Sequence, residues 1–447
     1  MTGVFRFTNF EYDETNGILS LHYRVDSYGE FTEKITFNGA RQVLTPAKKR
    51  VLNHIFKELH IAAGISYYKA FLSPDVQFDS YSVSQNEADF FNTFYVKGLG
   101  EFAYRNNVTV KPPFKVSADS RDVEECRRPD SEKIDLPKRC LTAVGGGKDS
   151  SVTIELLKKT NIPCVLFAMG NHRAIKETIQ AAELPYINVQ RELSPALLEL
   201  NKQGKVLNGH IPITGILSFI LLASAVIYGF NTVVMSNERS ASFGNTYKDG
   251  MSVNHQWSKS LEFENMLIKF VKDTITPSLN YFSLLRPYSE LGIASKFAEY
   301  TKYHNVFTSC NHAFKYVKEN RTERWCGQCD KCRFVYLILS PFIERKKLAA
   351  IFGDDLLNNP DNEKGYKELL GLSGFKPFEC VGEITESVAA LFMAADKSEW
   401  KDAYIVQQLL PQVIEKYSVQ ECENFVKQAF AESEQHNIPA EIAEKLF

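Results

Sequence analysis

Hydrophobic and polar residues alternate along residues 4–37 with the period of two that is typical of strands with one buried face. Turn-forming segments at 13–17 and 26–29 separate the apolar runs. The pattern therefore predicts an antiparallel meander at the start of the chain. Helical periodicity then begins at Pro46 and again near Ala88, so we expect helices to follow the meander.

From Cys140 the pattern changes to short apolar runs that alternate with helical segments. The runs at 140–144, 162–168 and 186–189 predict buried strands, and helical periodicity fills the segments between them. Strands that alternate with helices are typical of a parallel, doubly wound sheet. Beyond the sheet the pattern becomes helical, over 334–352, 383–395, 405–417 and 421–435.

Residues 211–235 form the most apolar stretch and have the length of a membrane span. The stretch carries Pro212 and an internal Gly229-Phe-Asn231 break, and no Lys or Arg cluster flanks it closely. We therefore interpret it as a buried helix over 212–228 followed by a core strand over 232–235, and we expect no membrane segment.

Composition and charge exclude several classes of protein. The 447 residues suffice for two or three domains, and 44% hydrophobic with 24% charged residues is ordinary for a globular chain. A net charge of −2 argues against nucleic-acid binding, because such proteins usually carry a basic excess. The N-terminus does not resemble a secretory signal, and nine unevenly spaced cysteines do not resemble a disulfide framework. We expect a cytoplasmic protein, and the sequence does not indicate its oligomeric state.

The strand predicted over 140–144 runs directly into three glycines and then into a helix start. Glycines let the backbone turn sharply, and the free N–H groups and dipole of a helix N-terminus attract phosphate. The spacing is not that of a Walker loop. Ligands of doubly wound sheets bind beyond the carboxyl ends of the strands. The predicted nucleotide-binding residues are Gly145, Gly146, Gly147, Lys148, Asp149, Ser150, Ser151, Met169 and Gly170.

The run Gly145-Gly-Gly-Lys-Asp-Ser150 resembles the Ser-Gly-Gly-x-Asp-Ser loop of the PP-loop ATP pyrophosphatases. The resemblance implies that ATP binds here with Mg²⁺ and that the enzyme adenylates its substrate. Gly145 stands where that family has serine, which removes one hydroxyl donor but leaves the backbone cradle.

Two polar segments, 236–245 and 253–264, follow the strand predicted over 232–235. Polar side chains gathered at the carboxyl end of a strand are typical of a substrate-binding loop. Arg239 suits a carboxylate because its planar guanidinium pairs bidentately. The candidate substrate-binding residues are Asn237, Arg239, Asn245, Asn254 and Gln256.

Cys326, Cys329 and Cys332 are each separated by two residues, which places three thiolates on one tight knuckle. With Cys310 as a fourth ligand the set describes a structural zinc site, because four sulfurs leave no open position. His312 could replace Cys310, and an iron–sulfur cluster is the alternative metal group. The 7-cyano-7-deazaguanine synthases, which are also PP-loop enzymes, resemble this chain in pairing the loop with a cysteine knuckle.

A closer resemblance rests on the glycine run together with Asn237-Glu-Arg-Ser-Ala-Ser-Phe-Gly-Asn245 and Val253-Asn-His-Gln-Trp-Ser-Lys-Ser260. These motifs look like those of the MurL-type UDP-N-acetylmuramoyl-L-alanyl-L-glutamate epimerases of peptidoglycan synthesis. The resemblance implies inversion of the terminal L-Glu of a UDP-sugar dipeptide, with ATP split to AMP and pyrophosphate. It also implies an α/β fold with a PP-loop core.

Adenylation of the glutamate carboxylate makes it ester-like and acidifies the α-carbon, so that a base can remove the α-proton. The candidate catalytic residues are Asp149, Glu238, His255, Lys259 and Cys380. Cys380 lies in the turn 376–383, where an ordinary half-buried thiol before a helix is the favoured interpretation.

We expect four regions along the chain. Residues 1–120 form an N-terminal α+β domain and 121–138 a charged linker, while 139–335 hold the PP-loop domain with the knuckle and 336–447 a helical region. Two other functions stay open. One is a different PP-loop adenylating enzyme that forms a thiolated, amide or nitrile product, and the other is a zinc-dependent RNA-binding module.

Overall fold

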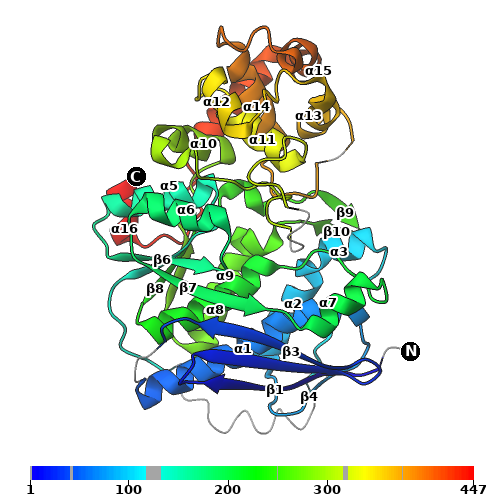
Figure 1. Cartoon of the computed structure of the whole chain (residues 1–447), viewed down its shortest axis with the longest axis vertical. Helices are drawn as coiled ribbons and strands as arrows, with labels where there is room; N and C mark the ends of the chain where they lie inside the picture. Colours follow the sequence, from blue (N-terminus) through cyan, green and yellow to red (C-terminus); the bar gives the residue numbers. More distant parts are fainter. Residues whose placement is uncertain (1–2, 41–43, 117–131, 249, 316–320, 375) are drawn as a thin grey trace.

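The computed structural model describes residues 3–40, 44–116, 132–248, 250–315, 321–374 and 376–447. Within these residues, nine strands join into one sheet and two more form a small hairpin. Figure 1 shows the sheet in the lower part of the molecule and the C-terminal helices gathered above it. The fold is thus mixed α/β, with a helical layer that stands apart from the sheet.

The five strands of the parallel half lie side by side in the predicted region. Across the whole sheet the order is β11 (Asn280–Ser283), β8 (Thr232–Met235), β5 (Cys140–Ala143), β6 (Cys164–Met169), β7 (Tyr186–Glu192), β3 (Gly29–Phe37), β2 (Ile18–Val25), β1 (Phe5–Asp13) and β4 (Val76–Phe78). Strands β11 to β7 are parallel, whereas β3, β2 and β1 pair antiparallel. The predicted parallel core and meander are both confirmed.

The meander and the parallel core belong to the same sheet. Strand β3 pairs antiparallel with β7, with Ile35 opposite Arg191. At this junction Glu33 is fully buried and accepts two hydrogen bonds from Arg191, at 2.7 and 3.1 Å. The strands of the region that the sequence assigns to an N-terminal domain therefore extend the central sheet.

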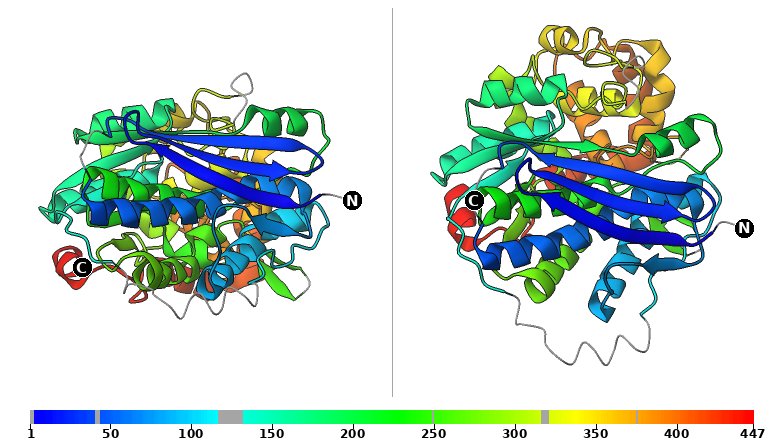
Figure 2. Two further views of the ribbon diagram at one scale, coloured as in Figure 1. Left: turned by 90° about the horizontal axis from the view of Figure 1, so that it is seen from below. Right: turned by 60° about the horizontal axis from the view of Figure 1, so that its bottom comes forward.

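Two long helices cover one face of this sheet. The first, α1 (Pro46–Phe71), starts at Thr45, whose hydroxyl accepts from the backbone N–H of Lys48 at 3.3 Å, and it packs on β1 and β2. The second, α8 (Ile213–Tyr228), is almost wholly buried and ends at Gly229 in a left-handed conformation. The two helices pack against each other (Figures 1 and 2). Aromatic and aliphatic side chains from β1–β3 fill the space beneath them.

The remaining helices either lie around the sheet or form the helical layer above it. Around the sheet lie α2 (Gln85–Gly98), α3 (Gly100–Arg105), α5 (Lys148–Lys159), α6 (Arg173–Ala182), α7 (Pro195–Lys202), α9 (Leu261–Phe270), α10 (Glu290–Glu299) and α16 (Ala440–Leu446). The upper layer holds α11 (Asp330–Leu339), α12 (Arg345–Phe352), α13 (Glu363–Leu369), α14 (Ile384–Ala395) and α15 (Tyr404–Phe430). Helix α10 contacts both α5 and α11, so it joins the two parts.

Short elements connect these parts near the site. They are the 3-10 turns η1 (Arg239–Ser242), η2 (Trp257–Lys259), η4 (Thr301–Tyr303) and η6 (Pro360–Asn362), the π turn η3 (Val271–Ile275), and the hairpin β9 (Thr246–Lys248) with β10 (Met251–Val253).

Some element predictions need correction. The single helix expected over 334–352 is two helices, α11 and α12, because Pro341 in the intervening turn cannot continue the first one. Most of the predicted linker, up to residue 131, lies outside the described residues. Residues 132–138 form neither helix nor strand. In the described part of the chain, no helix combines the length and apolar character that a membrane crossing requires.

Candidate active site

The turn between β5 and α5 is the tightest part of the site. Gly146 has a φ of +82°, and a Cβ on it would lie 2.9 Å from the backbone of Ala174 and of Ile175 in α6. Gly145, in contrast, has no neighbouring atom within 4 Å of such a Cβ. Only glycine fits at 146, so the close approach of the turn to α6 depends on that residue. We call Gly145–Gly147 the glycine turn.

The residues after the glycine turn start α5 without a side-chain cap. The hydroxyls of Ser150 and Ser151 both donate to the carbonyl of Gly147 at 3.1 Å. Lys148 is buried and contacts Asp149 and Glu290 rather than open space. The backbone N–H groups of the first helical turn therefore remain the donors that face outward from the helix end.

A cavity of about 500 Å³ lies beside this helix end, at the carboxyl ends of β5, β6 and β8. Its size is within the range of small-molecule sites. Of the predicted nucleotide-binding residues, Gly145, Gly147, Asp149, Ser150 and Met169 line it, whereas Gly146, Lys148, Ser151 and Gly170 do not. We call this space the turn cavity.

The opposite wall of the turn cavity carries four of the residues predicted from the polar segments and the 376–383 turn. These are Asn237, Glu238, Lys259 and Cys380. The end of β8 positions the first two, η2 positions Lys259, and the turn before α14 positions Cys380. Segments far apart in the chain thus bring a possible phosphate site and acid–base groups into one space.

Three carboxylates, from Asp149, Glu238 and Glu290, come together at the edge of this cavity, with oxygens within 4.8 Å of one another. Burial, reinforced by the negative charges of Glu290 and Asp149, raises the pKa of Glu238 to about 7. For Glu290, burial acts in the same direction, but the charges of Lys148 and Lys331 lower its pKa below the ordinary value. Clustered hard oxygen ligands are the kind that Mg²⁺ binds, so this carboxylate trio fits a divalent cation.

Cys380 lies between two basic side chains. The ammonium of Lys259 is 3.2 Å from its Sγ, and His255 hydrogen bonds to the same thiol. His255 does not line the turn cavity; it lies behind Cys380, with its Nδ1 against a carboxylate oxygen of Glu101 in α3. The half-buried thiol is therefore part of an ionic group rather than an isolated core residue.

A buried arginine fixes the backbone that carries Glu238 and Lys259. Arg286 is 1% exposed and donates to the carbonyl oxygens of Glu238 at 2.6 Å and of Lys259 at 2.5 Å. It also pairs with the buried carboxylate of Glu264 at 3.0 Å. One rigid guanidinium thus sets the spacing between the two segments that carry Glu238 and Lys259.

Three residues predicted to bind substrate make hydrogen bonds that hold the loop together. Asn245 donates to the carbonyl of Pro377 at 2.7 Å and accepts from the backbone N–H of His255. Asn254 donates to Ala241 at 2.9 Å, and Gln256 donates to Val381 at 3.4 Å. These contacts tie the polar segments to the turn that carries Cys380.

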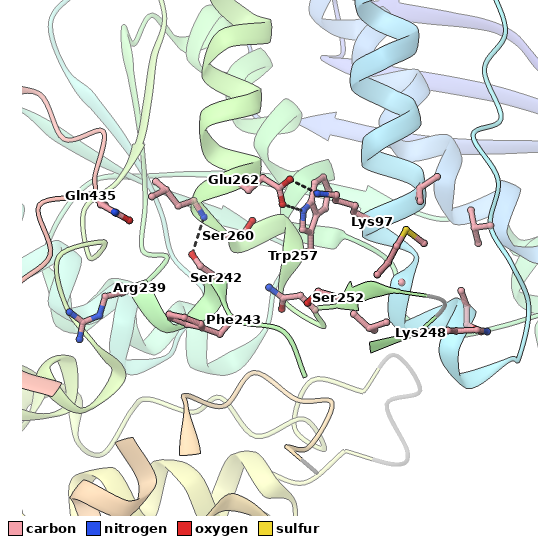
Figure 3. A pocket seen from close by; sticks show the side chains of 18 of the residues that line it. Lys97, Arg239, Ser242, Phe243, Lys248, Ser252, Trp257, Ser260, Glu262 and Gln435 are labelled. Carbon is pink, nitrogen blue, oxygen red and sulfur yellow. Dashed lines mark hydrogen bonds and ion pairs between the residues drawn. The ribbon is translucent and has the colours of Figure 1, made fainter. Parts of the chain in front are cut away.

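Arg239 lies at a different cavity. Its guanidinium donates to the carbonyls of Ala431 and Gln428, near the end of α15, at 2.8 and 3.1 Å. It lines a second cavity of about 550 Å³ together with residues of α2, α3 and the β9–β10 hairpin, including Asn254. Figure 3 shows Arg239 and Lys248 on opposite sides of this second cavity. The structure therefore places Arg239 outside the space that holds the glycine turn.

The four predicted metal ligands gather beside α11. The sulfurs of Cys310 and Cys329 are 3.9 Å apart, those of Cys326 and Cys332 are 3.7 Å apart, and those of Cys329 and Cys332 are 3.5 Å apart. Zinc–sulfur bonds of about 2.3 Å in a tetrahedron place the sulfurs about 3.8 Å apart. This cysteine cluster therefore fits a zinc ion, with no need for His312.

The sequence did not single out three residues that the structure brings into the site. Glu290 completes the carboxylate trio, Lys331 donates to the carbonyl of Cys380, and Glu101 contacts His255. Glu101 and Glu290 are ordinary charged residues at or near the start of a helix, with no motif around them, whereas Lys331 lies inside the cysteine motif. A local signal that the prediction missed is the N-cap serine Ser289, which directly precedes Glu290 at the start of α10.

Comparison with known proteins places the chain in a family. Residues 1–284 match the family described as the MurL N-terminal domain, and residues 306–424 match the MurL C-terminal domain. No solved structure matches the chain.

Curated relatives cover almost the full length. A protein of Xanthomonas oryzae pv. oryzae (strain MAFF 311018) named UDP-N-acetyl-alpha-D-muramoyl-L-alanyl-L-glutamate epimerase is 37% identical over 445 residues, which are 99% of this chain and 96% of that protein. Proteins of the same name from Salinispora tropica and Micromonospora sp. are each 39% identical over 415 residues, 92% of this chain and 89% and 91% of theirs. Because the N-terminal family alone matches well over half of the residues and the relatives align from end to end, this chain belongs to the MurL family.

Proposed function

We propose that this chain inverts the terminal L-Glu of UDP-N-acetylmuramoyl-L-alanyl-L-glutamate to D-Glu, with ATP consumed to AMP and pyrophosphate. The chain is thus an isomerase of peptidoglycan precursor synthesis. One observation carries the proposal. The glycine turn, Asp149 and Glu238 of the carboxylate trio, and the Lys259–Cys380 pair all line one cavity of about 500 Å³. The names of the relatives supply the substrate and the reaction.

The α5 end of the cavity suits the triphosphate of ATP. The glycine turn leaves the first N–H groups of α5 accessible, and a helix N-terminus attracts anions. The turn cavity extends along Phe167 and Met169, which suits the nucleoside. Bound at the carboxylate trio, Mg²⁺ would neutralise negative charge on the phosphates.

The chemistry on the substrate follows from adenylation. Attack of the glutamate carboxylate on the α-phosphate of ATP gives an acyl-adenylate and releases pyrophosphate. The α-proton of the acyl-adenylate is far more acidic than that of a carboxylate, so a base in the cavity wall removes it. Reprotonation on the opposite face inverts the centre, and water then releases AMP. Asn237, which lines the cavity, remains the candidate for contact with the substrate, and Glu238, Lys259 and Cys380 remain the proton-transfer candidates.

Two further proposals concern the protein as a whole. We assign zinc to the cysteine cluster as a structural ion, because its sulfur spacings match a tetrahedral site and four thiolates leave no open position. We also assign the chain to the cytoplasm, since every cysteine in the described residues is a free thiol.

The test is a reaction in deuterated water with the dipeptide substrate, ATP and Mg²⁺. The expected products are D-Glu dipeptide with deuterium at Cα, AMP and pyrophosphate. Asp149→Asn is the matched variant, since it removes one charge from the carboxylate trio and keeps the side-chain size. It should lose AMP formation while its thermal midpoint changes little, because Asp149 faces the cavity rather than the core.

The competing functions predict other products. An amide- or nitrile-forming enzyme would incorporate ammonia and leave the stereocentre untouched, and a thiolating enzyme would require a sulfur donor. Recovery of L-Glu dipeptide alone, with ATP consumed and nitrogen incorporated, would refute epimerisation and leave adenylation standing. RNA bound with a steep salt dependence, and no ATP turnover, would favour the RNA-binding module.

A further inference from the structure

The thiol of Cys380 lies where basic groups from three elements converge. Lys259 of η2 is 3.2 Å from Sγ, His255 hydrogen bonds to the thiol, and Lys331 of α11 donates to the carbonyl of the same cysteine. Cys380 also lines the turn cavity, across from the glycine turn. A thiol in these surroundings differs from an ordinary core cysteine, because the three basic groups favour its ionised form.

The charges outweigh the effect of burial. Burial alone would raise the pKa of Cys380, but the positive charge of Lys259 and the hydrogen bond from His255 lower it to about 5. For His255 the two effects act in the opposite directions. Burial alone would lower its pKa, because it disfavours the cation, but the hydrogen bonds to Cys380 and Glu101 raise the pKa to about 9. At neutral pH the pair is therefore a thiolate beside an imidazolium.

A carboxylate from the N-terminal part of the chain completes the arrangement. Glu101 of α3 is buried, and one of its oxygens contacts Nδ1 of His255 while the other accepts from Arg105 at 2.5 Å. His210 lies 3.6 Å from the same carboxylate and its ring is 4.4 Å from that of His255. Burial, together with the charge of His255, lowers the pKa of His210 to about 3, so that ring is neutral and does not compete for the carboxylate as a cation.

We propose that Cys380 is the base that takes the α-proton of the adenylated glutamate, and that Glu101 is a positioning residue that acts on it through His255. This assignment rests on the proposed function. In the step, the Cα–H bond breaks, its electron pair moves into the adenylated carboxyl group, and the proton passes to Sγ. A proton from water is added on the opposite face, and the Cys380 thiol then releases its proton to water.

The geometry favours Cys380 over the other candidates. Lys259 is held as a cation by the same thiolate, because the charges of Cys380 and Glu238 raise its pKa against the effect of burial. A protonated amine cannot accept the α-proton. His255 lies behind the thiol and does not border the turn cavity. Asp149 and Glu238 belong to the carboxylate trio, which suits a cation.

The first experiment measures the thiolate directly, without substrate. The full-length protein is treated with iodoacetamide from pH 5 to 9, and peptide mass spectrometry gives the alkylation rate of each cysteine. The rate at Cys380 should be nearly constant above pH 6, whereas an ordinary thiol with a pKa near 8.5 gains about tenfold per unit in this range. Cys164, a half-buried thiol in β6 whose pKa burial raises, is the internal reference in the same digest.

Variants of Glu101 test whether this residue acts on Cys380 through His255. Loss of its charge lowers the pKa of His255 and so raises that of Cys380, which moves the alkylation profile to higher pH. Glu101→Gln should therefore slow alkylation of Cys380 at pH 6 at least several-fold, and Glu101→Asp should restore part of it. A purely structural role of Glu101 would leave the profile unchanged. An ordinary titration of Cys380 in the unmodified protein would overturn the proposal.

The second experiment uses substrate. Cys380→Ala should reduce deuterium exchange at Cα by roughly 10²–10⁴-fold, the usual contribution of a general base, while it still forms at least one AMP per enzyme. Cys164→Ser should match the unmodified enzyme, and Glu101→Gln should lower kcat more than it changes KM.

The outcomes separate the two proposals. If the unmodified enzyme forms neither AMP nor D-Glu, the proposed function fails. The alkylation profile then still decides whether Glu101 acts on Cys380 through His255. If the unmodified enzyme epimerises and Cys380→Ala exchanges deuterium at the normal rate, the base assignment fails alone. A substrate-derived thioester on the Cys380 peptide would also overturn it, since the sulfur would then act as a nucleophile.

Discussion

Neighbouring glycines of the turn face different surroundings, which gives a matched pair of substitutions. A Cβ at position 146 would meet the backbone of α6 and would be strained at the left-handed φ of +82°, while a side chain at 145 meets open space. Gly146→Ala should lower the free energy of unfolding by roughly 1–3 kcal/mol, the usual magnitude for one strained residue, and should weaken ATP binding. Thermal denaturation and isothermal titration calorimetry measure the two effects.

Gly145→Ser is the control, and it introduces the residue that PP-loop pyrophosphatases carry there. Because nothing crowds position 145, its midpoint should match the unmodified protein, and the new hydroxyl adds a donor beside the proposed phosphate site. Equal stability of Gly146→Ala and Gly145→Ser would contradict the geometry of the turn.

Arg286 offers a second prediction at the scale of one residue. Arg286→Lys keeps the positive charge beside Glu264 but loses the planar fork that holds the carbonyls of Glu238 and Lys259. We expect turnover to fall at least tenfold because the walls of the turn cavity shift, while the loss of stability is smaller than for Arg286→Leu. Steady-state kinetics and thermal denaturation distinguish these effects.

The matched control for Arg286 is Arg139→Lys. Arg139 also donates to two backbone carbonyls, of Tyr228 and Gly229, but at the end of β5 that lies away from the turn cavity. Its substitution should change stability and leave kcat alone. A similar fall of kcat in both variants would mean that Arg286 has no special link to the site.

Sequence reasoning located the residues whose role is encoded locally. The glycine turn and the cysteine cluster are recognisable because their members lie close together along the chain and their spacing has a direct chemical meaning. Glu101 and Glu290 have no such spacing, since their roles arise from contacts with His255 and Lys148, which lie more than 140 residues away along the chain. Arg239 is the opposite case. Its residue type predicts a contact with a carboxylate, whereas in the structure its guanidinium donates to two backbone carbonyls near the end of α15.

Among the structural elements, the cysteine cluster controls how α11 begins. Cys329 is the N-cap of α11 and Cys332 lies in its first turn, so the proposed zinc would anchor the helix to the segment that carries Cys310. Cys329→Ser should lose about one zinc per chain and much of the stability, because such sites contribute folding free energy. Metal analysis and thermal denaturation provide the measurements.

Cys422→Ser serves as the control for this substitution. Cys422 is a fully buried thiol of α15 outside the cluster, so its replacement should leave the zinc content unchanged. Full zinc retention by Cys329→Ser would contradict the assignment, and iron with inorganic sulfide in place of zinc would identify an iron–sulfur cluster.

At the scale of the elements, the hydrophobic pattern predicted those helices and strands in which buried positions recur at one regular spacing. The strand over 232–235 and the helix before it were predicted within one residue, because their apolar runs are continuous. The pattern missed α9 and α10, which each carry a charged residue at a buried position. In α10 the buried Glu290 is compensated by Lys148 and Lys331, a partnership that no local pattern reveals.

For the whole molecule, the junction between β3 and β7 determines whether the chain unfolds as one unit. The Glu33–Arg191 pair is bidentate and almost completely buried there. Glu33→Gln should lower the free energy of unfolding by about 3–5 kcal/mol, the usual effect of removing one partner of a buried pair. Calorimetry should still show a single transition, since the sheet is continuous across the junction.

Asp26→Asn gives the comparison for a surface pair. Asp26 pairs with Arg6 and Arg24 on the exposed side of the meander, and such pairs contribute at most about 1 kcal/mol. A split transition in Glu33→Gln, with the meander melting separately, would mean that residues 1–120 form an independent domain as the sequence suggested.

The continuous sheet also has a consequence for how the protein is made. Strand β3 ends at Phe37, but the strand that covers its free edge starts at Tyr186, so 148 residues lie between them. Ribosomes add roughly 5–20 residues per second, and the edge of β3 therefore stays uncovered for about 7–30 s during synthesis. An open strand edge is a template for pairing with another chain. Production of this protein should therefore depend on chaperones and on the speed of translation between β3 and β7, and slow codons in that interval should lower its soluble yield.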